Sequence, residues 1–208
     1  MYRTELSVNP TLSHVVAITG TIGSGKSTVI ELLRKQKAFV VSADEIAREV
    51  VLPGTTGLKQ VVDTFGPGIL ADDGALDRKK MGTLVFADGA RKKALEALLH
   101  PLIAKRAEEI FKDAIARGVS PIVYEVPLLF EAGLHKAGFK KIIVVTADDD
   151  TCIERVMKRD GLSIEQARER LASQIPTEVK LKGADVVLDN SGSISELERA
   201  VLGIFPNL

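Results

Sequence analysis

The chain has 208 residues, of which 45% are hydrophobic, and its 28 lysine and arginine residues balance its 28 aspartate and glutamate residues. A chain of this length is expected to fold around one sizeable core, with room for a small insertion on it. The even charge balance argues against a nucleic-acid partner, and the apolar runs are far shorter than the roughly 20 residues of a membrane-spanning helix, so we predict no membrane partner either.

The start of the chain and its cysteine content indicate a compartment. Residues 1–10 lack an apolar stretch long enough for a secretory signal, so we expect a short polar extension before the first strand. The single cysteine, Cys152, cannot form a disulfide within the chain, which suits a reducing environment. Its acidic neighbours, Asp148–Asp150 and Glu154, are expected to raise the thiol pKa, which argues against a catalytic thiol. We therefore predict a cytoplasmic protein, and the sequence leaves its oligomeric state open.

A glycine-rich loop follows the first predicted strand, Val15–Thr19. Residues 20–27 read G-T-I-G-S-G-K-S, which fits the pattern G-x-x-x-x-G-K-[ST], and apolar residues follow at helical spacing over 28–35. In this order the loop N–H groups and the helix start converge on a phosphate chain, Lys26 reaches the outer phosphates, and the Ser27 hydroxyl ligates Mg²⁺. A plain glycine-rich turn with a surface lysine is the weaker alternative. The predicted nucleotide-binding residues here are Gly20, Gly23, Ser24, Gly25, Lys26, Ser27 and Thr28.

An acidic residue, Asp44, follows the second predicted strand, Phe39–Ser42. As a structural residue it would cap a helix over 45–51. As a functional residue it would orient an acceptor hydroxyl and take its proton while a phosphoryl group is transferred. The residues alone leave both interpretations open.

Three further strand-like runs complete an alternation that predicts a parallel five-stranded sheet with helices on both faces. They are Pro121–Val126, Lys141–Thr146 and Asp185–Leu188. About 80 residues separate the second strand from the third, far more than one crossover helix needs. We therefore predict a helical, acceptor-binding insertion over 54–118, at the ligand-binding edge of the sheet. The nucleotide-binding core is expected to comprise 15–53, 119–147 and 183–208.

Several helix starts carry recognisable caps. Two capping boxes are predicted, Ser163 with Gln166 and Ser193 with Glu196. Asp88 is expected to cap a helix that ends at Leu99. Pro101 is then expected to begin the next helix, so that His100 joins the two.

A basic segment follows the fourth predicted strand, over 148–182. Such a run is often only a solvated helix face. A phosphoryl group in transfer needs cations around its oxygens, and this segment follows a phosphate-binding core, so we interpret it as a mobile lid. Its basic residues include Arg155, Lys158, Arg159, Arg168, Arg170 and Lys180.

The ordered motifs from about Val15 to Leu202 resemble those of the dephospho-CoA kinase family. They include T-G-T-I-G-S-G-K-S-T at 19–28, A-D-E-I-A-R at 43–48, G-A-L-D-R at 74–78, H-P-L-I at 100–103, P-L-L-F-E at 127–131, Gln174 and A-D-V-V-L-D-N at 184–190. The resemblance implies a P-loop kinase fold. It also implies transfer of the γ-phosphate of ATP to the ribose 3′-hydroxyl of dephospho-CoA, with Mg²⁺.

The resemblance also implies roles for individual residues. Asp44 becomes the catalytic base, and Arg155 and Arg159 become lid arginines that act in catalysis together with Lys26. Asn190 matches a position close to the adenine. The acceptor site is expected to include Asp44, Arg48, Arg78, His100 and Glu131.

Two positions depart from the family pattern. Ser42 replaces the first acid of the usual D-x-D, and Cys152 stands where glutamine is common. Glu125, at the end of the third predicted strand, is either a replacement for a water-mediated contact to Mg²⁺ or an acid without a metal role.

Three other functions share part of this pattern. Another small-molecule kinase would differ only in its acceptor. A GTP-dependent switch would need an N-K-x-D tetrapeptide, whereas Asp189–Gly192 lacks both the lysine and the spacing. An ATPase motor would need a strand that ends in a metal-binding acid, whereas Asp148, after the fourth strand, is interpreted as a helix cap.

Overall fold

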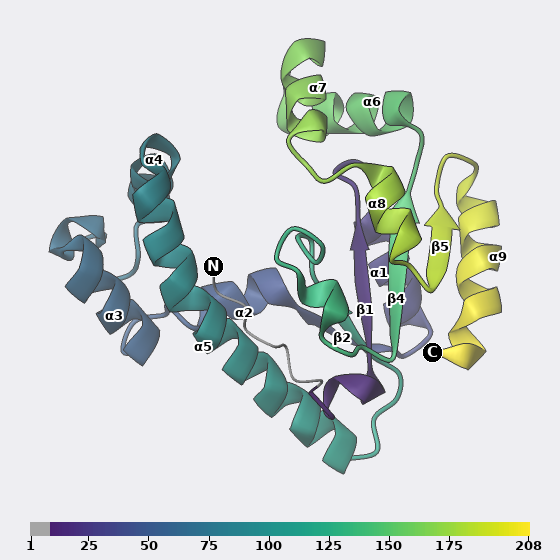
Figure 1. Ribbon diagram of the computed structural model, residues 1–208, viewed down its shortest axis with the longest axis horizontal. Coiled ribbons are helices and arrows are strands. Elements are labelled where there is room, and N and C mark those ends of the chain that lie inside the picture. The colour runs from purple at the N-terminus through teal and green to yellow at the C-terminus, as the bar shows by residue number, and fades with distance from the viewer. Residues whose placement is uncertain (1–8) are drawn as a thin grey trace. The chain divides into compact units, whose positions relative to one another are not determined.

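One parallel sheet organises the fold (Figure 1). The computed structural model describes residues 9–208, so the expectation for residues 1–8 lies outside them. The strand order is β2-β3-β1-β4-β5, and β1 pairs in parallel with β3 and β4, as β4 does with β5. The strands are β1 (Val15–Gly20), β2 (Phe39–Ser42), β3 (Ile122–Glu125), β4 (Lys141–Thr146) and β5 (Val186–Asp189). The predicted sheet is confirmed, and each strand end lies within one residue of its expected place.

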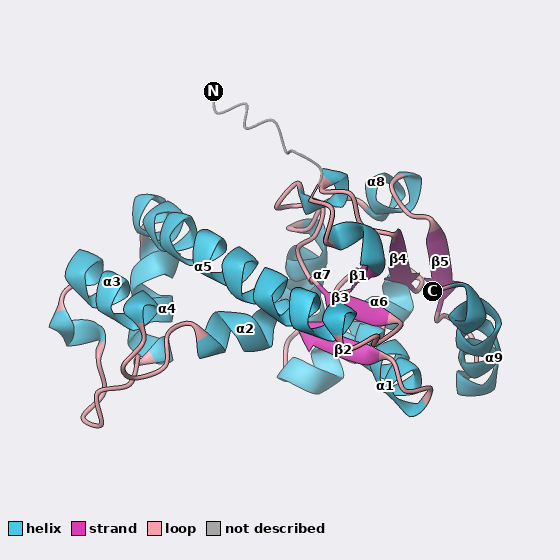
Figure 2. Cartoon of the chain, turned by 90° about the horizontal axis from the view of Figure 1, so that it is seen from below, coloured by secondary structure: helices cyan, strands magenta, loops and turns pink. Residues whose placement is uncertain are grey.

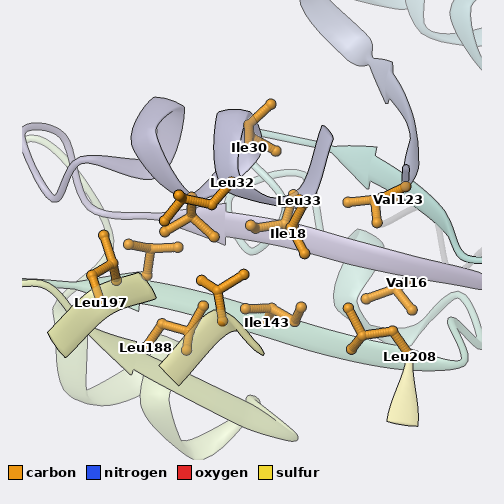
Figure 3. Close-up of a cluster of buried hydrophobic side chains, with 14 residues drawn as sticks. Val16, Ile18, Ile30, Leu32, Leu33, Val123, Ile143, Leu188, Leu197 and Leu208 are labelled. Atoms are coloured by element: carbon orange, nitrogen blue, oxygen red, sulfur yellow. The ribbon is translucent and has the colours of Figure 1, made fainter. Parts of the chain in front are cut away.

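Two helices cover one face of the sheet, α1 (Lys26–Lys35) and α9 (Ile194–Ile204). Side chains alternate between the two faces along a strand, so Val16 and Ile18 of β1 point to the same side. They join one buried cluster with apolar side chains from both helices (Figure 3). This packing fixes β1 against α1, and therefore fixes the loop that connects them.

Three helices follow β4, namely α6 (Asp149–Asp160), α7 (Ile164–Ala172) and α8 (Thr177–Lys182). The Asp148 side chain accepts a hydrogen bond from the Thr151 N–H, so the predicted cap of α6 is confirmed. Both predicted capping boxes are also confirmed, at the starts of α7 and α9. Helix α8 packs against β4 on the side of the sheet opposite α1 (Figures 1 and 2). Helices therefore lie on both faces, as predicted.

The chain forms two compact units. The sheet unit comprises the chain up to Val41 together with Ala114–Leu208, and the helical unit comprises Ser42–Asp113. The helical unit holds α2 (Ala43–Glu49), α3 (Thr56–Phe65), α4 (Arg78–Ala87) and most of α5 (Gly89–Ala116). Its own core gathers Val51, Val61, Ile69 and Met81. Within residues 9–208, no helix combines the length and the apolar character needed to cross a bilayer.

Helix α5 corrects one prediction, because Pro101 lies inside a continuous helix and does not begin a new one. The linking role expected of His100 is wrong for the same reason. Proline cannot donate to the carbonyl four residues earlier, so the helix loses one hydrogen bond there. Packing of Leu95 and Leu99 into the helical core holds the turns before the proline. The expected cap at the start of α5 is confirmed, since Asp88 accepts hydrogen bonds from the N–H groups that follow it.

Candidate active site

The loop between β1 and α1 has a backbone that only glycine fits at two positions. Gly23 and Gly25 have φ angles of 80° and 81°, in the left-handed region. A Cβ on Gly23 would lie 2.4 Å from the carbonyl oxygen of Cys152, and a Cβ on Gly25 would lie 2.1 Å from Nδ2 of Asn190. The glycine pattern read from the sequence therefore has a steric cause in the structure.

The loop presents unused backbone donors at the start of α1. Among residues 9–208, the N–H groups of Gly23, Gly25, Lys26 and Ser27 donate to no acceptor. The Ser24 N–H is used within the loop, since it donates to the Thr21 carbonyl at 3.1 Å. The Thr28 N–H is also used, since it donates to the Gly25 carbonyl at 3.0 Å. Free N–H groups at a helix start attract anions, because the helix dipole adds to them. This arrangement suits a phosphate chain.

The loop lysine is paired within the sheet unit. Lys26 Nζ lies 2.5 Å from Glu125 Oε1, and each side chain is 18% exposed. Glu125 ends β3, which lies beside β1, so the strand that leads into the loop also brings this carboxylate to it. The sequence left open whether Glu125 contacts Mg²⁺ through water or has no metal role. The structure shows a further role, because Glu125 is the ion-pair partner of Lys26.

Two predicted site residues, Arg155 and Asn190, meet behind the loop. Arg155 donates from Nη1 to the Gly23 carbonyl at 3.4 Å and from Nη2 to the Asn190 carbonyl at 3.0 Å. Asn190 Nδ2 donates to the Ser24 carbonyl at 2.8 Å. These contacts turn loop carbonyls toward the protein, which leaves the opposite side of the loop to its N–H groups.

The other predicted lid arginine, Arg159, makes its contacts elsewhere. Its guanidinium donates to both carboxylate oxygens of Asp160, at 2.8 and 3.0 Å, and Arg170 approaches the same carboxylate at 2.5 Å. The hydrogen bond from Arg159 is the largest influence that holds the pKa of the Asp160 carboxyl below its usual value. Arg159 is 60% exposed, and its role toward the nucleotide remains a prediction.

The helical unit carries Asp44, Arg48, Arg78 and His100, and all four are exposed. Ser42 occupies the position before α2, so the interpretation of Asp44 as the helix cap is wrong, because Asp44 lies in the first helical turn. Within the described chain the Asp44 carboxylate has no hydrogen bond or ion pair. Asp44 and Arg48 share one face of α2 by their spacing of four residues, and Arg78 Nη2 lies 3.5 Å from the Arg48 carbonyl oxygen.

Sequence reasoning missed two contacts to the loop. Gln174 Oε1 accepts a hydrogen bond from the Ile22 N–H at 2.9 Å, and the hydroxyls of Thr177 and Thr21 lie 3.1 Å apart. The sequence pointed to Gln174 only through the family resemblance, and no local pattern predicts its hydrogen bond with Ile22. Glu131, predicted for the acceptor site, contacts Lys180 at 3.1 Å, and its role toward the acceptor stays a prediction.

The residues present fit a magnesium ion shared with phosphates. No group of three or more histidine, cysteine, aspartate or glutamate side chains within residues 9–208 forms a cage for a metal. Mg²⁺ usually keeps several waters and binds through few protein groups plus substrate phosphates. The Ser27 hydroxyl is exposed and makes no hydrogen bond within the described chain, so it is available as such a ligand.

Cys152 is buried, its backbone lies against Gly23 of the loop, and its thiol lies 3.7 Å from the Ala147 carbonyl oxygen. Burial first and the charge of Asp149 second raise its pKa from 9.0 to about 11, as its acidic surroundings suggested. Between pH 9.0 and about pH 11 the thiol of the folded chain therefore keeps its proton, whereas the thiol of an unfolded chain loses it.

We therefore expect that Cys152 resists labelling by a thiol reagent at about pH 8 until the chain unfolds. We also expect its contribution to the free energy of unfolding to be complete below pH 9.0 and to be lost as the pH rises toward about 11. Denaturant titrations across this range, with Cys152→Ala as the reference, measure that contribution. An identical pH dependence in the two proteins contradicts the expectation.

Comparison with known proteins places this geometry in a family. The family model described as dephospho-CoA kinase matches residues 14–196. A dephospho-CoA kinase of Geobacter sulfurreducens is 45% identical over 188 residues, which cover 90% of this chain and 95% of that protein. One of Streptomyces avermitilis is 43% identical over 93% of each chain. The solved dephospho-CoA kinase of Campylobacter jejuni is 30% identical and superposes with a TM-score of 0.72, covering 93% of this chain and 96% of its own.

Proposed function

Since this chain belongs to the dephospho-CoA kinase family, we propose that it transfers the γ-phosphoryl group of ATP to the ribose 3′-hydroxyl of dephospho-CoA, giving coenzyme A and ADP. The observation that carries the proposal is the loop at 20–27, whose free N–H groups lie inside the family match. The loop supports binding of a nucleotide triphosphate, and membership of the family supports dephospho-CoA as the acceptor. The single buried cysteine suits the reducing cytosol, where we place the reaction.

The chain's own residues act on the nucleotide mainly by electrostatics. The N–H groups of Gly23, Gly25 and Lys26 hold the phosphate chain, and the Lys26 ammonium stabilises charge on the transferred group. Arg155 keeps the loop in shape and adds a positive charge behind it. When bound by Ser27 and the phosphates, Mg²⁺ supplies further neutralisation of the charge that develops in transfer.

Asp44 is proposed as the base for the acceptor. As the oxygen–phosphorus bond to the acceptor forms and the bond to ADP breaks, the hydroxyl proton passes to the Asp44 carboxylate. What supports this role is a carboxylate that is exposed, caps no helix and directly follows a strand of the nucleotide-binding sheet.

The remaining site residues are proposed to bind the acceptor or to close over the nucleotide. Arg48 and Arg78 are exposed cations of the helical unit, and the Arg78 guanidinium reaches the backbone carbonyl of Arg48, which suits the diphosphate of dephospho-CoA. His100 and Glu131 complete the proposed acceptor set. The insertion over 54–118 would hold the acceptor, and 148–182 would act as the lid.

The proposal predicts which acceptor stimulates ADP release. We expect dephospho-CoA to stimulate it strongly and AMP, CMP, UMP, shikimate and adenosine to do so far less, because contacts to the long pantetheine arm help to position the reacting hydroxyl. ADP release is measured with and without each acceptor, and mass spectrometry and phosphorus NMR locate the new phosphate. Efficient phosphorylation of a monophosphate, with dephospho-CoA inert, would leave another small-molecule kinase as the function.

A further inference from the structure

A short segment between α7 and α8 holds the phosphate loop from one side. Its first residue, Gln174, accepts the hydrogen bond from the Ile22 N–H, and its last, Thr177, contacts the Thr21 hydroxyl. We call residues 174–177 the strap. The strap therefore occupies the N–H of Ile22, the residue directly before Gly23 and its free donor.

A charge pair between a buried lysine, Lys180, and a partly buried glutamate, Glu131, fixes the strap. Glu131 Oε1 accepts a hydrogen bond from the Ile175 N–H at 3.3 Å and lies 3.1 Å from Lys180 Nζ. The Lys180 side chain is 0% exposed, and its ammonium lies off the hydrogen-bonding direction although it is within ion-pair distance. Glu131 Oε2 is buried and receives no hydrogen bond from any described residue. The pair is therefore poorly satisfied for groups removed from water.

Such a pair is a weak source of stability. Taking two charges out of water is unfavourable, and well-packed apolar residues often stabilise a fold as well or better. The geometry of the contacts indicates what the pair achieves instead, because Glu131 binds the strap backbone while Lys180 holds Glu131. One carboxylate thereby joins the loop after β3, the strap and α8.

We propose that Lys180 and Glu131 are positioning residues for nucleotide binding, which act through the strap on the phosphate loop. With the pair intact, Gln174 keeps the Ile22 N–H occupied and the loop stays in the single shape that aims its free N–H groups at phosphate. Without it, the strap shifts, the Ile22 N–H is released, and fewer molecules hold a binding-competent loop. The apparent affinity for nucleotide falls in proportion to that fraction.

The experiment measures two quantities on the full chain, hydrogen exchange at the Ile22 amide without ligand and the dissociation constant for ADP. The variants are Lys180→Met, which removes the charge and keeps an unbranched apolar side chain, and Gln174→Met, which removes the acceptor. The matched control is Lys182→Met, an exposed lysine in the same helix. The amide of Ile143, a buried residue of β4, which pairs with β1 and β5, reports global stability.

We expect exchange at Ile22 to accelerate and the ADP dissociation constant to rise, each by about tenfold, in Lys180→Met and in Gln174→Met. The control should match the unmodified protein. The double variant, Lys180→Met with Gln174→Met, should change exchange and affinity by less than the sum of the two single effects, because both substitutions act on the strap. If Lys180→Met does not fold, Glu131→Gln takes its place in the same comparison.

The proposal is overturned if Lys180→Met or Glu131→Gln speeds exchange at Ile143 while leaving Ile22 exchange and ADP affinity as in the control. That result would make the pair a purely structural contact. Additive effects of the lysine and glutamine variants would also overturn it, since they would show that the pair does not act through the strap. Both outcomes are independent of which acceptor the enzyme phosphorylates.

Discussion

Replacing Lys26 with alanine is expected to lower kcat/KM by at least about 10²-fold, the size of effect seen when one donor to a transition state is removed. The fold should remain intact, because Lys26 is the first residue of α1 and its side chain pairs with the Glu125 carboxylate. Steady-state kinetics and the melting temperature measure the two effects separately. Lys35→Ala, at the exposed end of the same helix, is the control and should match the unmodified protein.

Glu125, the ion-pair partner of Lys26, allows a second test of the role of the lysine. In Lys26→Ala the Glu125 carboxylate loses its cation and is left near the phosphate loop, so repulsion adds to the loss of binding. The double variant Lys26→Ala with Glu125→Gln removes that repulsion. We expect it to recover part of the ADP affinity and none of the turnover. Near-normal turnover in Lys26→Ala, or recovery of turnover in the double variant, would contradict a direct role of the lysine.

The phosphate loop and its strands could be predicted because their signals are local. Apolar runs locate β1 and β4, and the spacing of Gly20, Gly25 and Lys26 requires a tight turn before a helix. Local signals also located the capping residues, since Ser163 and Ser193 bond to groups three residues away. In each case the physical interaction spans a few residues, and so does its pattern in the sequence.

The same local reasoning failed where tertiary packing decides. Pro101 signals a helix boundary by its chemistry, yet α5 is continuous, and the turns before the proline pack into the core of the helical unit. The pairing of Lys26 with Glu125 and the bond from Ile22 to Gln174 join residues far apart in the chain. Such contacts depend on the strand order and on how helices pack on the sheet, which no single stretch of sequence specifies.

Asp44→Asn is expected to lower kcat by roughly 10²- to 10⁴-fold, the usual contribution of a positioned general base. Asparagine keeps the shape of the side chain and loses the capacity to take the hydroxyl proton. Because Asp44 is not the cap of α2, the change removes no capping bond. A carboxylate in the first turn of a helix gains about 0.3–1 kcal/mol from the helix dipole, so the loss of stability should be small.

A neighbouring residue provides the matched control for this variant. Glu45 is the other acidic residue in the first turn of α2, and it is also exposed. Glu45→Gln removes the same charge from the same helix end, so both variants should melt at nearly the same temperature. Only Asp44→Asn should lose turnover, with the KM for dephospho-CoA changed little, because a base acts on the transition state more than on the bound substrate. Equal activity in the two variants, accompanied by a lower melting temperature for each, would reduce Asp44 to a charge that stabilises its helix.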